Sequence, residues 1–286
     1  PVDKRDLEAF DKAFFGHMGF TVTNVVRSFL MGVSFGRLGR PALGGPLAGY
    51  LGELTRFSAA FAAVSDVCMA VLGARLKRME MLSGRMADAF AWMYLTSATV
   101  KRFMDEGHAA KDLPAARWAC EYGLFQVQTA LEGVIDNFPQ PFVRMKLRGW
   151  VFPFGARRRL PSDAMSRKLA RAILDGGELR ERLTTDIYVP KTAEPGLGFL
   201  ERTLDQIVAA APVELLLKDA VKTGRIPKGS RSALAKAGVE AGIITPADAE
   251  LVLAAQAARD EAIQVDAFSA DYFASHPHAA PAVSEV

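Results

Sequence analysis

The chain has 286 residues, of which 50% are hydrophobic, so it can bury a substantial core and is not an intrinsically disordered protein. Its formal net charge is only +3, and without a long basic patch this excludes a typical nucleic-acid-binding protein. Its uncharged stretches are shorter than the roughly 18 residues that a spanning helix needs. We therefore predict no membrane-crossing segment.

Apolar residues at three- and four-residue steps dominate the first half of the chain and predict helices. Residues 6–35 are predicted to form either one long helix or a broken one. The Pro- and Gly-rich stretch over residues 36–52 predicts a loop. The predicted helices cover residues 6–35, 54–72, 82–104 and 113–138. Four helices with short links indicate an antiparallel bundle over residues 1–138.

The pattern changes after residue 138. Residues 139–162 hold four prolines, an aromatic cluster and three consecutive arginines, which predicts an irregular basic connector. A smaller helical region is expected over residues 163–273, and a disordered tail over 274–286. Its helices are expected near residues 163–175, 197–210, 213–223, 231–241 and 246–262. No stretch alternates as a strand would, so the predicted fold class is all-α.

The positive charge is concentrated in one segment. Residues 139–171 carry nine basic side chains against Asp163 alone, whereas residues 172–286 carry 11 basic and 17 acidic ones. Aromatic rings favour the headgroup level of a bilayer, and basic side chains are attracted to anionic lipid. The candidate residues for binding an anionic surface are Arg144, Lys146, Arg148, Trp150, Arg157, Arg158 and Arg159.

Two other interpretations of this segment remain open. One is a solvated connector whose aromatic residues fold back onto the bundle. The other is a contact with an anionic partner, such as the phosphates of CoA or the acidic C-terminal third of the chain itself. Nucleic acid is not expected as a partner.

The motifs with chemical potential are weak. Gly32-Val33-Ser34-Phe35-Gly36 matches the nucleophile elbow of hydrolases, but that motif requires a strand-to-helix turn, so a helix end is the better interpretation. Cys68 and Cys120 lie in apolar helical patterns and are predicted to be small core residues in a reducing compartment. The charges Arg56/Asp66 and Arg85/Asp88 are interpreted as interhelical ion pairs or solvated helix flanks. The histidines, which show no metal-ligand spacing, are His17, His108, His276 and His278.

Several stretches resemble one protein family. They are LTRFSAAF at 54–61, SDV at 65–67, LKRMEMLSGRMAD at 76–88 and YLTSATVKRF at 94–103. Further matches are Asp112-Leu113-Pro114, Asn137-Phe138-Pro139, Phe152-Pro153, Pro161-Ser162-Asp163 and QVDAF at 264–268. With these residues the chain resembles, over most of its length, the helical C-terminal domain of bacterial acyl-CoA dehydrogenases of fatty-acid β-oxidation, of the long- and medium-chain kind.

The resemblance implies a flavoenzyme. Members of the family use FAD to convert acyl-CoA to trans-2-enoyl-CoA, and their flavin site and glutamate base lie in the portion that precedes this domain. No catalytic, cofactor-binding or metal-binding residue is therefore assigned here. Glu132 in particular stands in a bundle-helix context that does not match the family's base. The segment alone is expected to be inactive and to bind no FAD.

The expected function is that of an auxiliary domain, which supports the enzyme, mediates dimerisation or docks it on a membrane. The expected partners are the catalytic flavin-binding part of the same polypeptide, a second copy in a homo-oligomer, and a membrane surface. We expect a cytoplasmic protein, with a peripheral place at the inner membrane as one option. The alternative is a stand-alone helical interaction module without enzymatic activity.

Overall fold

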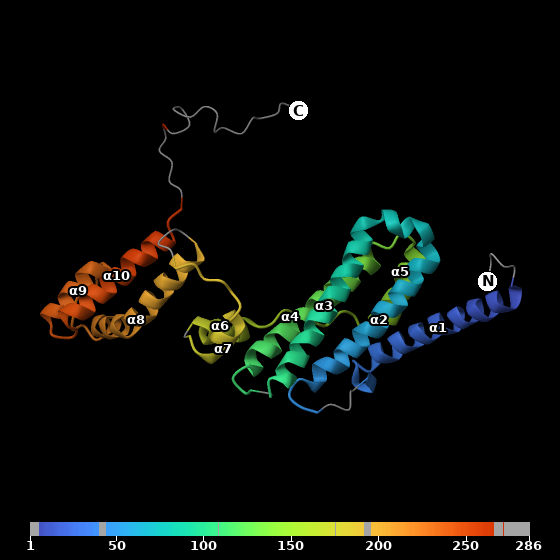
Figure 1. Cartoon of the computed structure of the whole chain (residues 1–286), viewed down its shortest axis with the longest axis horizontal. Helices are drawn as coiled ribbons and strands as arrows, with labels where there is room; N and C mark the ends of the chain where they lie inside the picture. Colours follow the sequence, from blue (N-terminus) through green and yellow to red (C-terminus); the bar gives the residue numbers. More distant parts are fainter. Residues whose placement is uncertain are drawn as a thin grey trace. The chain divides into compact units, whose positions relative to one another are not determined.

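The computed structural model describes residues 6–39, 44–107, 109–174, 176–191, 196–265 and 271 (Figure 1). The described residues form helices and no strand, which confirms the predicted all-α fold. The helices are α1 (Leu7–Val33), α2 (Ala48–Leu72), α3 (Glu80–Asp105), α4 (Leu113–Asp136), α5 (Pro141–Val151), α6 (Asp163–Leu174), α7 (Glu178–Thr184), α8 (Leu197–Lys222), α9 (Arg231–Glu240) and α10 (Pro246–Ala262), with 3-10 helices η1 (Arg37–Gly39) and η2 (Gly73–Arg78).

The chain divides into two compact units, residues 1–183 and residues 184–286. Unit 1 therefore contains the predicted bundle, the predicted connector and the start of the predicted smaller region. The predicted disordered tail over 274–286 and the histidines His108, His276 and His278 lie outside the described residues.

The core of unit 1 is built by α2, α3 and α4. The apolar stripe of α2 is buried as its spacing predicts, with Phe57, Val64 and Cys68 almost completely enclosed. Residues 48–78 are long and apolar enough, by length and composition, to cross a membrane. The core helix of a folded bundle has the same composition, and its buried side chains give α2 that role in unit 1.

The close contact between the end of α1 and the start of α2 requires glycine at one position, Gly36. α1 is one continuous helix, capped at its start by Asp6, whose carboxylate accepts a hydrogen bond from the Ala9 amide at 3.0 Å. Gly36 follows the helix with φ +75°, and a Cβ on it would lie 2.4 Å from the Gly52 carbonyl oxygen. This close approach and the positive φ both require glycine. The helix α2 begins at Ala48, inside the loop predicted to extend to residue 52.

The predicted connector is only partly irregular. Residues 141–151 form α5, so the prediction of an irregular connection is wrong for this stretch. Pro141 stands in the first turn of α5, where a missing N–H costs nothing. Leu147 and Val151, four residues apart, are both buried in the core of unit 1. Residues 152–162 carry no helix, as expected.

Unit 2 packs α8, α9 and α10 around one small core. The sequence predicted two helices on either side of Pro212, but α8 continues through this residue. Ala210, Val213 and Leu217 lie on one stripe that is buried in the core of the unit, and this packing keeps the helix intact across the proline. α10 starts with a capping box, in which Thr245 and Asp248 bond each other's backbone amides, as its sequence indicates.

Candidate functional site

The four basic-segment candidates on α5 have different surroundings. Arg148 is ion-paired with Asp136 and lies 4.0 Å from Glu132. Arg144 donates to the Asp136 carbonyl oxygen at 3.1 Å, and Lys146 lies 5.3 Å from the ring centre of Phe142. Trp150 is half-buried against the core of unit 1. The exposed face of α5 therefore presents Lys146 together with Phe142 and Met145, which are 65% and 60% exposed.

The three consecutive arginines lie after α5 and have different contacts. Arg158 is ion-paired with Glu53 of α2, and its backbone amide and carbonyl both bond the buried side chain of Gln128, at 2.8 and 3.2 Å. Arg157 and Arg159 are exposed. The Arg157 guanidinium lies 5.0 Å from the ring centre of Phe35. The segment is thus fastened to α2 and α4 through its middle residue.

Four of the seven candidate residues carry a positive charge that is not neutralised by an ion pair. Arg144, Lys146, Arg157 and Arg159 have no carboxylate partner among the residues that the structure describes. They form two separate groups, one on α5 and one after it.

The charges within the bundle do not form the ion pairs that were one of the two interpretations made from the sequence, whereas Asp88 is exposed, as expected for a solvated helix flank. Asp66, which is buried, accepts a hydrogen bond from the Asn24 side-chain amide at 2.8 Å rather than binding Arg56. Arg56 has no carboxylate within ion-pair distance in the described part of the chain. Burial lowers the pKa of its guanidinium, and the neighbouring Glu53 opposes this. Arg85 donates to the Met81 carbonyl of its own helix and makes no ion pair with Asp88 there.

An apolar surface that sequence reasoning missed lies on α1. The buried residues of this helix are Asn24, Ser28 and Gly32, and most of its large apolar side chains are exposed. Ser28 donates to the Trp150 carbonyl oxygen at 3.4 Å, and a Cβ on Gly32 would lie 3.0 Å from Pro153. The helix therefore packs on α2 and α5 through small and polar residues. The four-residue spacing of these three residues was the available signal.

We call the outward face of α1 the α1 stripe. Its members recur at three- and four-residue steps, and each is at least 43% exposed. They are Phe15, Met18, Val22, Val26 and Phe29. Further exposed apolar residues toward the start of the helix are Leu7, Phe10 and Phe14. A continuous exposed apolar surface of this kind marks an interaction site.

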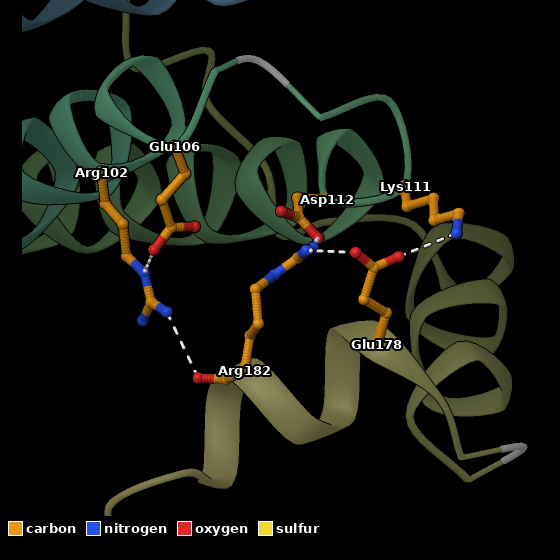
Figure 2. A network of polar contacts seen from close by, with 6 residues as sticks. All are labelled: Arg102, Glu106, Lys111, Asp112, Glu178 and Arg182. Carbon is orange, nitrogen blue, oxygen red and sulfur yellow. Dashed lines mark hydrogen bonds and ion pairs between the residues drawn. The ribbon is translucent and has the colours of Figure 1, made fainter.

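A network of charges joins α7 to the ends of α3 and α4 (Figure 2). Arg182 is ion-paired with Asp112 and with Glu178, the latter at 3.0 Å. Glu178 also bonds Lys111 at 2.8 Å, and this hydrogen bond is the main cause of the lowered pKa of its carboxyl. Arg102 donates to the Arg182 carbonyl oxygen at 3.3 Å. The network fastens a short helix and contains no nucleophile.

The remaining chemical motifs have structural roles. Ser34 is the C-cap of α1, and its hydroxyl donates to the Met31 carbonyl oxygen at 3.3 Å, which confirms the helix-end interpretation. Cys68 and Cys120 are free and buried, as predicted, and burial raises the pKa of their thiols to about 11 and about 12. Burial also raises the pKa of the Glu132 carboxyl, against the effect of Arg148. Among the described residues, no group of three or more acidic, histidine or cysteine side chains could hold a metal ion.

Comparison with known proteins identifies the family to which the chain is similar. The family described as acyl-CoA dehydrogenase, C-terminal, bacterial type, matches residues 2–268. No solved structure matches the chain.

Proposed function

From its membership of the bacterial-type acyl-CoA dehydrogenase C-terminal family, we propose that the chain is the auxiliary helical domain of a FAD-dependent acyl-CoA dehydrogenase. The complete enzyme would convert acyl-CoA to trans-2-enoyl-CoA in fatty-acid β-oxidation. The domain would attach to the catalytic part of the enzyme through the α1 stripe and contribute no catalytic group of its own.

The exposure of the α1 stripe is the observation that carries this proposal. Helices pack against one another through apolar residues at alternating three- and four-residue steps, which the stripe provides along about four turns of α1. Met18 and Val22, at its middle, are 48% and 61% exposed. Covering such side chains with another helix removes apolar surface from water at about 25 cal/mol per Å². The family assignment supplies the partner.

The test is association between this chain and the flavin-binding part of the enzyme, produced as two polypeptides. We expect the two to elute together in gel filtration, with FAD retained by the partner. The double variant Met18→Asp/Val22→Asp should elute separately, because burying two carboxylates in an apolar interface is strongly unfavourable. The control is Thr23→Asp, which adds a charge to an exposed site beside the stripe.

The outcomes separate the alternatives. The double variant should leave the thermal unfolding of the isolated chain unchanged, because both side chains are exposed in unit 1. Co-elution of the double variant with the catalytic part would contradict docking through the stripe. A concentration-dependent dimer of the isolated chain, lost in the double variant, would show that a second copy covers the stripe instead. No binding by the parent would favour the stand-alone module.

A membrane surface is a second candidate partner, and the exposed face of α5 favours it. Phe142 and Met145 stand there beside Lys146, with Arg144 one residue away from Met145. Apolar and basic side chains on one exposed helix face are typical of binding to the interface of an anionic bilayer.

A further inference from the structure

A cavity of about 590 Å³ lies in unit 1 beside the three consecutive arginines. This volume is within the range of small-molecule sites in proteins. Its charged lining consists of four arginines and two glutamates, which leaves an excess of two positive charges. These residues are Arg56, Arg157, Arg158, Arg159, Glu53 and Glu121. Uncharged lining residues include Phe35 and Ser162.

Arg56 is the unusual member of this lining. It is only 7% exposed and has no ion pair with any described residue. Its Nη2 makes one long hydrogen bond, 3.5 Å, to the Val151 carbonyl oxygen, and its buried Nε has no hydrogen-bond partner. The guanidinium lies 4.9 Å from the ring centre of Phe57. A buried guanidinium with unused donors is strongly stabilised by an anion.

The two carboxylates of the cavity do not meet this need. Glu53 uses its oxygens on Arg158, and the Nε distance of that pair is 2.6 Å. Glu121 accepts a hydrogen bond from the Tyr50 hydroxyl at 3.0 Å. Arg56, Arg157 and Arg159 therefore remain as cations without a carboxylate partner in the described part of the chain. The cavity therefore has an excess of positive charge and hydrogen-bond donors that no carboxylate of its lining uses.

We propose that this cavity binds a phosphate group, with Arg56 at its floor and Arg157 and Arg159 at its rim. A phosphate dianion matches the excess of two positive charges. Its tetrahedral oxygens can accept from several guanidinium forks at once, whereas a carboxylate has only two oxygens in one plane. The Arg158–Glu53 pair serves as the fixed wall, because Gln128 clamps the Arg158 backbone to α4. The phosphate belongs either to a small soluble ester or to a lipid headgroup.

Calorimetric titration of the full chain with pyrophosphate, and with inorganic phosphate, at constant ionic strength tests this site. We expect saturable binding of pyrophosphate with a dissociation constant below about 1 mM. The variant Arg56→Met keeps the apolar stem and removes the donors, and should weaken binding by roughly tenfold or more. Because Arg56 is buried, a second variant pair keeps the test independent of folding. Arg157→Ser/Arg159→Ser changes two exposed residues and should weaken binding by a similar factor.

The matched control is Arg144→Ser/Lys146→Ser, which removes the same charge from α5, outside the cavity lining. It should leave pyrophosphate affinity within about twofold of the parent, because exposed distant charges are screened. If the parent chain binds no pyrophosphate at a concentration about tenfold above the expected dissociation constant, the proposal is overturned. Equal weakening by the control pair would also overturn it, because binding would then be general charge attraction.

Vesicles of phosphatidic acid distinguish the source of the phosphate. If the headgroup occupies the cavity, pyrophosphate should displace the chain from these vesicles, and Arg56→Met should weaken vesicle binding by a factor similar to its effect on pyrophosphate affinity. If the ligand is a soluble ester, pyrophosphate should bind the cavity without affecting co-sedimentation. The site shares no residue with the α1 stripe, so its failure and the failure of the proposed docking are separate results.

Discussion

Gly123 determines how closely α3 and α4 approach each other. A Cβ at this position would lie 2.1 Å from Oγ1 of Thr96, a buried hydroxyl that donates to the Trp92 carbonyl at 2.7 Å. Neither group can move without breaking this bond or shifting a helix. We therefore expect Gly123→Ala to lower the free energy of unfolding by about 1–3 kcal/mol, as overpacking does in other cores.

Gly84 on α3 provides the control for this substitution. It is exposed, and a Cβ there would meet no atom within 4 Å. Gly84→Ala should raise the free energy of unfolding by roughly 0.5–1 kcal/mol, because alanine is the better helix former. Urea denaturation of the two variants measures both changes in the free energy of unfolding, which should have opposite signs. If Gly123→Ala is as stable as the parent, the close packing of α3 on α4 is incorrect.

At the scale of single residues, the sequence predicted the core better than the surfaces. Cys68 and Cys120 could be placed inside because they follow the period of their helices. The orientation of α1 could not, because hydrophobicity alone predicts that Val22 and Val26 face the bundle, whereas both are exposed. Asn24 instead faces inward because Asp66 offers it a buried hydrogen bond. Such a partner on another helix is not visible in a local pattern.

At the scale of elements, packing decided the differences. The sequence does not predict α5 because Pro139, Pro141 and the aromatic residues around them indicate a loop, whereas burial of Leu147 and Val151 supports a helix there. α8 was divided at Pro212 because proline usually ends a helix, but its buried stripe continues on both sides. α7 has only seven residues and was missed, since so short a helix depends on contacts rather than on period.

The attachment of α7 should depend on pH. The Glu178 carboxyl has a pKa below its ordinary value of 4.5, first through its hydrogen bond with Lys111. A carboxyl whose pKa is lowered by folding contributes stability above its unfolded pKa and loses it as pH falls through the folded pKa. The network of α7 should therefore weaken below about pH 4.5 and be intact at pH 7. The methyl signals of Leu179, which is buried, report the change by NMR.

The variant Glu178→Gln is the control for this pH effect. It cannot ionise, so its Leu179 signals should lose the acid-dependent change and resemble those of the parent at low pH. Added salt should weaken the network at pH 7, because the Lys111 and Glu178 side chains are exposed. An unchanged Leu179 environment between pH 7 and pH 3 in the parent would refute a role for Glu178 in holding α7.

At the scale of the whole molecule, unit 1 has three candidate binding surfaces, whereas the sequence predicts one, the basic segment. The α1 stripe is apolar, the cavity beside Arg157 is cationic, and the exposed face of α5 combines both characters. The family and the all-α fold could be predicted because they rest on long helical patterns and on sequence stretches characteristic of the family. The division of the basic segment could not, because it depends on which arginines meet Glu53 and Asp136.

Binding to an anionic membrane should therefore depend on α5 rather than on the whole basic segment. Arg148 and Arg158 are ion-paired. The candidate residues without a carboxylate partner in the described part of the chain are Arg157 and Arg159, which line the cavity, and Arg144 and Lys146, which share α5 with the exposed Phe142 and Met145. Basic side chains near an anionic surface contribute about 1 kcal/mol each. We expect the full chain to co-sediment with vesicles that contain phosphatidylserine, and to be released by added salt.

The double variant Arg144→Ser/Lys146→Ser should weaken this binding by about 2 kcal/mol, or roughly 30-fold. The matched control Lys222→Ser/Lys228→Ser removes the same charge from exposed residues of unit 2 and should leave binding close to that of the parent. Phe142→Ser should also weaken binding, because its exposed ring would insert at the headgroup level. If the α5 variants bind as the parent does, or if neutral vesicles bind the chain equally well, α5 does not contact the membrane.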